Sequence, residues 1–153
     1  MEYATPAWNP HLKSDILAVE SVQRAFTRRI PRLEDANYPL RLEILGLDSL
    51  EERRLKADLT EIFKIVTNRS GLFFEDFFTY SNDFGLRTEN SLQLKIRLAK
   101  TNLGKFSFFN KGADVWNTLP DYVVNSPSVE RFKTNISERN MTNHLICFPM
   151  HYV

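Results

Sequence analysis

The feature that most constrains the fold is a helical repeat of apolar residues in the first half of the chain. Its longest example is "LEERRLKADLTEIFKIVTN", in which the apolar side chains recur every three or four residues and so share one helix face. These side chains are Leu55, Leu59, Ile62, Phe63 and Val66. Asp48 or Ser49 can cap this helix, and Glu51 and Glu52 fall in its first turn, where the helix dipole favours negative charge. The pattern predicts a long helix that packs one face into a core.

An earlier helix is expected from about residue 13 to residue 30, because apolar residues repeat there with the same period. The stripe that would face the core consists of Leu12, Ile16, Val19, Val22, Phe26 and Ile30. By the same period, Lys13, Arg24 and Arg28 project from the opposite face. Pro31 cannot continue a helix and disfavours helical geometry in the residue before it, so the helix should end there.

Three shorter helices are predicted from proline, glycine and serine signals. "YPLRLEILGL" has Pro39 in a first turn and Gly46 at a C-terminal stop. Two more helices are expected at about residues 107–119 and 127–138. Ser126 would be the N-cap of the last one and Pro127 its first residue.

The segment "SLQLKIRLAK" changes period, because its leucines and Ile96 alternate with polar or basic residues as in a half-buried strand. The predicted fold is therefore mainly α: a small helical bundle with one short β-strand or hairpin around residues 91–100. We expect a helical segment at residues 1–70, a basic strand and helical pair at 71–139, and a flexible tail at 140–153.

Composition narrows the class of protein. The chain has 153 residues, of which 42% are hydrophobic, which suffices for a core. No apolar run is long enough to cross a membrane, and the first residues lack the pattern of a secretory signal. A single cysteine excludes an internal disulfide. These features predict an intracellular protein, cytoplasmic or nuclear, that does not bind membranes.

The sequence offers few candidate catalytic or metal-binding motifs. No phosphate-cradling glycine motif and no nucleophile elbow is present. The carboxylates between residues 50 and 63 alternate with Arg and Lys, which is typical of a solvated helix face. His144, Cys147 and His151 could ligate a metal, but zinc normally takes four ligands in paired spacing. We therefore predict no metal, no catalytic residue and no small-molecule substrate.

Positive charge is concentrated in two places. Residues 87–111 carry six Lys or Arg against one acid, among them Lys95, Arg97, Lys100 and Lys105. The first helix adds Arg24, Arg28 and Arg29. Such cations can follow a phosphate backbone, so they predict nucleic-acid binding. Two alternatives remain: basic side chains that protect a strand edge, and a protein-interaction module.

The order of several motifs resembles one family. "EYATPAWNP" is followed by "ILAVESVQRAFTRRIP", then by "YPLRLEILGLDSLEERRLKADLTEIFKIV", a basic strand and "VWNTLPDYVVNSPSVERFK". This series is similar to the segment immediately downstream of the polymerase core in reverse transcriptases of non-LTR (LINE-like) retrotransposons, of the jockey and chicken-repeat type. The resemblance covers about residues 2–138, nearly the whole chain.

The resemblance implies thumb-like helices that grip the backbone of RNA or an RNA–DNA hybrid without reading its sequence. It implies structural roles for Trp8, Trp116, Asn117 and Pro120 as anchors and helix stops. The family's polymerase needs paired aspartates to hold Mg²⁺, and this chain has no Asp-Asp pair, so the fragment should not polymerise DNA. Mg²⁺ is expected only with the missing core.

Two other outcomes stay open at this stage. The chain could be a helical protein-interaction or remnant domain with no affinity for nucleic acid. It could also self-associate through an apolar face of the first helix.

Overall fold

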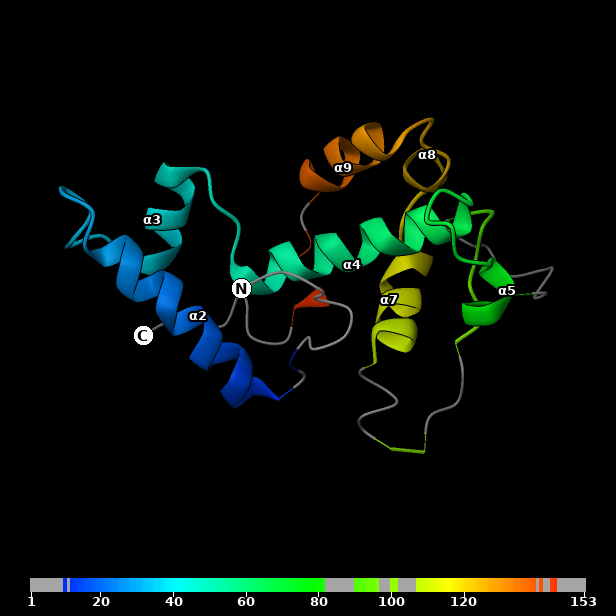
Figure 1. Cartoon of the computed structure of the whole chain (residues 1–153). Coiled ribbons are helices and arrows are strands. Elements are labelled where there is room, and N and C mark those ends of the chain that lie inside the picture. Colours follow the sequence, from blue (N-terminus) through cyan, green and yellow to red (C-terminus); the bar gives the residue numbers. More distant parts are fainter. Residues whose placement is uncertain are drawn as a thin grey trace. The chain divides into compact units, whose positions relative to one another are not determined.

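A computed structural model describes residues 10, 12–81, 90–96, 100–101, 107–139, 141, 144 and 145. These residues are mainly helical, as predicted (Figure 1). In chain order the helices are α2 (Lys13–Arg28), α3 (Tyr38–Leu45), α4 (Leu50–Val66), α5 (Phe74–Phe77), α7 (Phe108–Asn117), α8 (Asp121–Val124) and α9 (Val129–Ser137).

The chain divides into two compact units, and the division falls inside α4. The N-terminal unit comprises Pro10–Arg54 together with Met141–Val153, and the C-terminal unit comprises Leu55–Asn140 together with Met1–Asn9. The segment boundaries that we predicted at residues 70 and 139 stay predictions.

In the N-terminal unit, α2 packs beside α3 (Figure 1). The local signals of α3 act as predicted: Pro39 lies in its first turn, and Gly46 ends it in the left-handed conformation at φ 61°. Its N-cap is Asn37, whose side-chain oxygen accepts a hydrogen bond from Leu40 N at 3.0 Å.

The buried face of α2 is not the predicted apolar stripe. Its buried side chains are Ile16, Glu20 and Thr27. Val22 and Phe26, which we expected in the core, are 50% and 69% exposed. The helix is therefore rotated about its axis relative to the prediction.

Polar contacts explain this rotation. The carboxylate of Glu20 accepts hydrogen bonds from the Tyr38 hydroxyl and from Leu50 N, the latter at 3.0 Å. Gln23 Nε2 donates to Asp48 O at 3.0 Å. Buried polar groups must find partners, so these bonds fix which side of α2 faces α3 and the start of α4.

The α4 residues Leu55, Leu59, Ile62 and Phe63 are buried, as predicted. The prediction of a solvated charged face holds only in part, because Arg53 is exposed and Glu52 and Glu61 are half-buried, whereas Glu51, Arg54, Lys56 and Asp58 are buried. All four interact with other groups, which is how buried charges are tolerated. A helix buried on several sides hides these charges even though their spacing is that of an exposed face.

Aromatic rings from α4, α7 and α9 form the core of the C-terminal unit. The Phe132 ring stacks on that of Phe63, with centroids 4.3 Å apart, and lies 6.0 Å from that of Trp116. Gly112 lets α7 approach α4 closely, because a Cβ there would lie 2.4 Å from Ile62 Cδ1. Trp116 and Phe132 have no measurable exposure, so this core is well sealed.

The Trp-Asn pair at the end of α7 holds an extended segment of the chain. Trp116 Nε1 donates to Leu92 O at 2.8 Å. The Asn117 side chain accepts from Leu94 N and donates to Leu94 O, both at 2.8 Å. From the extended segment, Asn90 Nδ2 donates to Trp116 O and Leu119 O, two carbonyl groups at the end of α7.

The predicted strand around residues 91–100 is only a single antiparallel bridge, between Tyr80 and Leu94, in the part of it that the structure describes. Two hydrogen bonds flank the bridge, from Ser81 N to Gln93 O and from Lys95 N to Thr79 O. Asn117 occupies the outward backbone groups of Leu94, so a further strand cannot bond at this edge.

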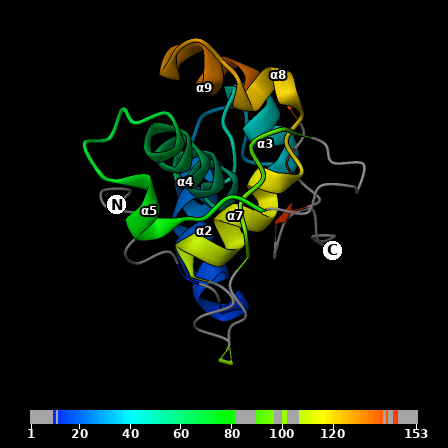
Figure 2. The same cartoon turned by 90° about the vertical axis from the view of Figure 1, so that its right-hand side faces the viewer.

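The last helices differ from the prediction in one cap. α7 follows Ser107 as expected, but the N-cap of α9 is Ser128 rather than Ser126. Ser126 instead donates to Val123 O at 2.6 Å and accepts from Asn135 Nδ2 at 3.0 Å. These bonds connect α9 to the short helix α8, which lies beside it (Figure 2).

Candidate nucleic-acid interface

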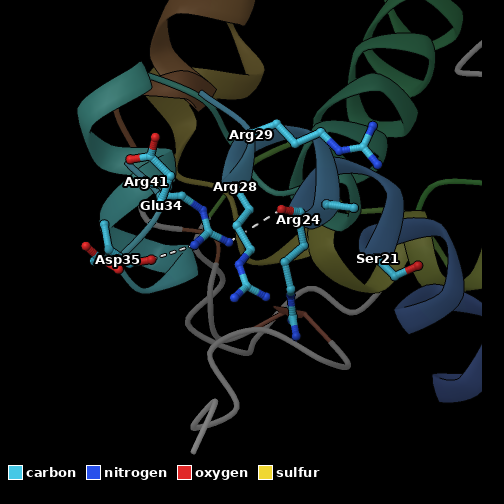
Figure 3. Close-up of a pocket in the computed structure, with 9 residues that line it drawn as sticks. Ser21, Arg24, Arg28, Arg29, Glu34, Asp35 and Arg41 are labelled. Carbon is cyan, nitrogen blue, oxygen red and sulfur yellow. Dashed lines mark hydrogen bonds between the residues drawn. The ribbon is translucent and has the colours of Figure 1, made fainter. Parts of the chain in front are cut away.

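The N-terminal unit has an open hollow between α2 and the segment leading into α3 (Figure 3). Its volume is about 780 Å³. Four arginines and two carboxylates are among its lining residues, which are Ser21, Arg24, Ala25, Arg28, Arg29, Glu34, Asp35, Ala36 and Arg41. The excess of two positive charges favours anionic ligands.

Arg24 and Arg28 are one helical turn apart on α2 and extend from the same side of it (Figure 3). Arg28 is exposed, and Arg24 is half-buried. The guanidinium carbon of Arg24 lies 5.0 Å from the centroid of the Tyr38 ring, a cation–π contact that holds the side chain in place.

Arg41 supports the hollow from α3. Its Nε donates to Thr27 Oγ1 at 3.2 Å, and its two terminal nitrogens donate to the carbonyl oxygens of Ala36 and Arg24. These bonds join both sides of the hollow. Each of its three nitrogens makes one bond within the unit, so Arg41 mainly contributes charge and rigidity to the hollow.

Arg29 differs from its neighbours. It is exposed and contributes to the lining, but its side chain extends away from Arg24 and Arg28 (Figure 3). The three arginines that the sequence placed together therefore form a pair and a separate third residue.

Arg41 was missed by the sequence analysis, although a signal was present. It lies three residues after Tyr38 and next to Leu42, so it shares the buried face of α3 with them. A charged residue on an apolar helix face must be engaged by other groups, and here it is engaged by the hollow.

The arrangement suits phosphate esters. Guanidinium groups bind phosphate oxygens through paired N–H donors, and two arginines one turn apart can contact successive phosphates. Glu34 and Asp35 line the rim and would repel an anion there, so they restrict where a phosphate chain can lie.

The second basic group, in the C-terminal unit, is only partly described. Lys95 and Lys100 are exposed, whereas the predicted contacts Arg97 and Lys105 lie outside the described residues. Lys95 is next to the bridge formed by Tyr80. Burial raises the pKa of the Tyr80 hydroxyl, and the carboxylate of Glu75 raises it further, so acidic charge is also close to this segment. The hollow is therefore the better-defined candidate.

Of the predicted anchors, Trp116 and Asn117 make the contacts given above, and Pro120 immediately precedes α8. Trp8 lies outside the described residues.

The described residues contain no group of three His, Cys, Asp or Glu side chains that could hold a metal ion. Of the metal candidates considered from sequence, Cys147 and His151 lie outside the described residues. None of the described helices combines the length and apolar character needed to cross a membrane.

Comparison with known proteins gives no match, whether to a protein-family model, to a curated protein or to a solved structure.

Proposed function

We propose that this chain binds the phosphate backbone of RNA or an RNA–DNA hybrid through the arginine hollow and performs no chemistry itself. The observation that carries the proposal is the pair Arg24 and Arg28, which extend from the same side of α2 one helical turn apart, with Arg24 resting on the Tyr38 ring. The contacts would be electrostatic, so binding would be independent of base sequence.

The motif order described above supports a parent protein of a particular kind. In our proposal the chain is a segment of a non-LTR retrotransposon reverse transcriptase that follows the polymerase core, and it acts in the cytoplasm or the nucleus. The catalytic aspartates and their Mg²⁺ would belong to that core. In the parent, the hollow would hold template–primer near the site of synthesis.

The test is fluorescence anisotropy of a short labelled RNA–DNA hybrid, titrated with the full chain at rising salt. Arg28→Glu should weaken binding about tenfold, and Arg24→Glu/Arg28→Glu more, because repulsion replaces attraction. The slope of log affinity against log salt should become shallower by about one for each phosphate that is no longer neutralised. Arg28→Glu is informative even if the double variant is poorly folded, since Arg28 is exposed.

A matched control is Arg131→Glu/Lys133→Glu, which makes the same change in net charge on exposed positions of α9. If this control weakens binding as much as Arg24→Glu/Arg28→Glu, the effect reflects overall charge and the hollow is not the site. If folded wild-type protein does not bind the hybrid at low salt, the proposed function is wrong.

A second function, protein interaction, is favoured by the apolar side chains that α2 exposes. The dependence of binding on salt distinguishes these two functions. Phosphate binding weakens steeply as salt rises, whereas an apolar contact does not.

A further inference from the structure

The exposed side of α2 carries an apolar seam, which we define as Leu12, Val19, Val22 and Phe26. Leu12, Val22 and Phe26 are 54%, 50% and 69% exposed, and Val19 is half-buried. These residues lie on the opposite flank of the buried face from Arg24 and Arg28, at 100° per residue around the helix. Hence the seam is distinct from the Arg24–Arg28 pair, and the two surfaces meet only at Ala25 and Arg29, which also line the hollow.

The spacing of the seam matches that of helices that pair along their length. Together with Asp15 and Arg29, its positions advance by alternating steps of three and four residues, as in the seam of a coiled coil. Ala18 and Ala25 border the seam and are exposed, so their small side chains permit close approach of a second helix. Single exposed apolar residues need no explanation, but an ordered row of them does.

The charges at the two ends of the seam are opposite. Asp15 lies in the first turn of α2, and Arg29 lies at its C-cap; both side chains are exposed. Two copies aligned in parallel would bring Asp15 beside Asp15 and Arg29 beside Arg29. In an antiparallel pair, the acidic end of each helix meets the basic end of the other. The two helix dipoles then run in opposite directions, which is also favourable.

From this pattern we infer that the chain forms an antiparallel homodimer through α2. Val19 of each copy packs against the partner's Val22, and Phe26 lies at the level of the partner's Asp15. Arg29 then lies at the level of the partner's Leu12, one step from the carboxylate of the partner's Asp15. The interface is self-complementary, as a two-fold dimer requires.

This dimer leaves Arg24 and Arg28 uncovered, since they occupy another flank of α2. A dimer would carry two arginine pairs, one on each outer side, because Arg24 and Arg28 lie across α2 from the seam. The dimer itself does not depend on the proposed function and can be tested without nucleic acid.

The test is sedimentation equilibrium of the full chain over a concentration range of about 1 to 100 µM, which detects dimers with micromolar dissociation constants. Wild-type protein should shift from monomer to dimer across this range. Phe26→Glu should raise the dissociation constant at least tenfold. Ile44→Glu is the matched control, because Ile44 on α3 is 57% exposed in the same unit but lies off the seam.

Charge exchange tests the orientation. Asp15→Arg and Arg29→Asp should each raise the dissociation constant of the dimer, by up to about tenfold. The double variant Asp15→Arg/Arg29→Asp should restore the wild-type dissociation constant, because the two ends of the helix remain opposite in charge. Circular dichroism should show unchanged helix content in all variants, and Val22→Glu replaces Phe26→Glu if the latter does not fold.

Three results would overturn the inference. The first is a wild-type protein that stays monomeric throughout the range. The second is a dimer that Phe26→Glu and Ile44→Glu affect equally. The third is a charge-exchanged double variant that dissociates like the single variants, which would exclude the antiparallel arrangement.

Discussion

The two units of this chain are stabilised in different ways. The C-terminal unit has a sealed aromatic core around Trp116, Phe63 and Phe132. In the N-terminal unit, much of the buried surface of α2 is polar and bonds through Glu20 and Gln23, while Val22 and Phe26 of the same helix face outward. Both units expose some large apolar side chains, such as Phe26 in the N-terminal unit and Phe73 in the C-terminal unit. The difference lies in what is buried, which is a cluster of aromatic rings in the C-terminal unit and hydrogen-bonded polar groups beside α2 in the N-terminal unit. We therefore expect substitutions of buried apolar residues to lower stability most in the C-terminal unit, and substitutions of buried polar residues to matter more in the N-terminal unit.

The largest effect is expected from Trp116→Ala. The indole is fully buried, and its Nε1 donates to Leu92 O, so its removal leaves a cavity and an unpaired carbonyl. The free energy of unfolding should fall by about 3–5 kcal/mol, measured by urea denaturation with circular dichroism as the signal.

Phe73→Ala provides the control in the same unit. Phe73 is 73% exposed, so its removal should change the free energy of unfolding by less than about 0.5 kcal/mol. Equal decreases in the two variants would mean that the aromatic core is not what stabilises the C-terminal unit.

An intermediate effect is expected from Glu20→Gln, which tests the polar interior of the N-terminal unit. The carboxylate accepts from both the Tyr38 hydroxyl and Leu50 N. An amide has one acceptor oxygen and no charge, so it loses the bond from Leu50 N to Oε2 and weakens the bonds from Tyr38 and Leu50 N to Oε1. Urea denaturation should show a decrease in the free energy of unfolding of about 1–3 kcal/mol.

Glu43→Gln makes the same chemical change at an exposed position of α3 and should have almost no effect. If Glu20→Gln were equally harmless, the polar contacts would not determine the rotation of α2. The apolar seam would then need another explanation for its exposure.

Helix positions could be predicted from sequence because their signals are local. Pro39 and Gly46 bracket α3, and Ser107 precedes α7, as the sequence indicated. Ser126 and Ser128 both precede α9, however, and the Ser126 hydroxyl is engaged by Val123 at the end of α8 and by Asn135, so it does not cap α9.

The face of a helix that is buried cannot be predicted from local signals in the same way. The period of α2 located an apolar stripe, but Glu20 found partners in Tyr38 and Leu50, which are 18 and 30 residues away in the chain. No local pattern reports such pairings. The same limit applies to the extended segment, because the Asn117 side chain that bonds the outward backbone groups of Leu94 is 23 residues away.

The candidate site was predictable in part. The spacing of Arg24 and Arg28 placed them on one helix face, and the structure has them side by side on the hollow. The contribution of Arg41 and the separate direction of Arg29 depend on how α3 packs and how α2 ends, which the sequence pattern does not show.

The smallest effect is expected at the rim of the C-terminal unit, where Asp121 at the start of α8 accepts from Ser91 N at 2.7 Å and from Ser91 Oγ at 2.8 Å. The backbone hydrogen bond from Ser91, followed by the bond from its hydroxyl, lowers the pKa of this carboxyl in the folded state. A lowered pKa means that the ionised group stabilises the fold above its unfolded-state pKa. This contribution disappears as pH falls through the folded-state pKa. Asp121→Asn should therefore be slightly less stable than wild type at neutral pH, and the difference should vanish in acid.

The measurement is the urea midpoint of Asp121→Asn and wild type from neutral to acidic pH, with Asp114→Asn on the exposed side of α7 as the control. A difference that persists unchanged in acid would show that the carboxylate's charge is not what binds Ser91. The extended segment would then depend on Asn90, Trp116 and Asn117, whose hydrogen bonds do not titrate in this range.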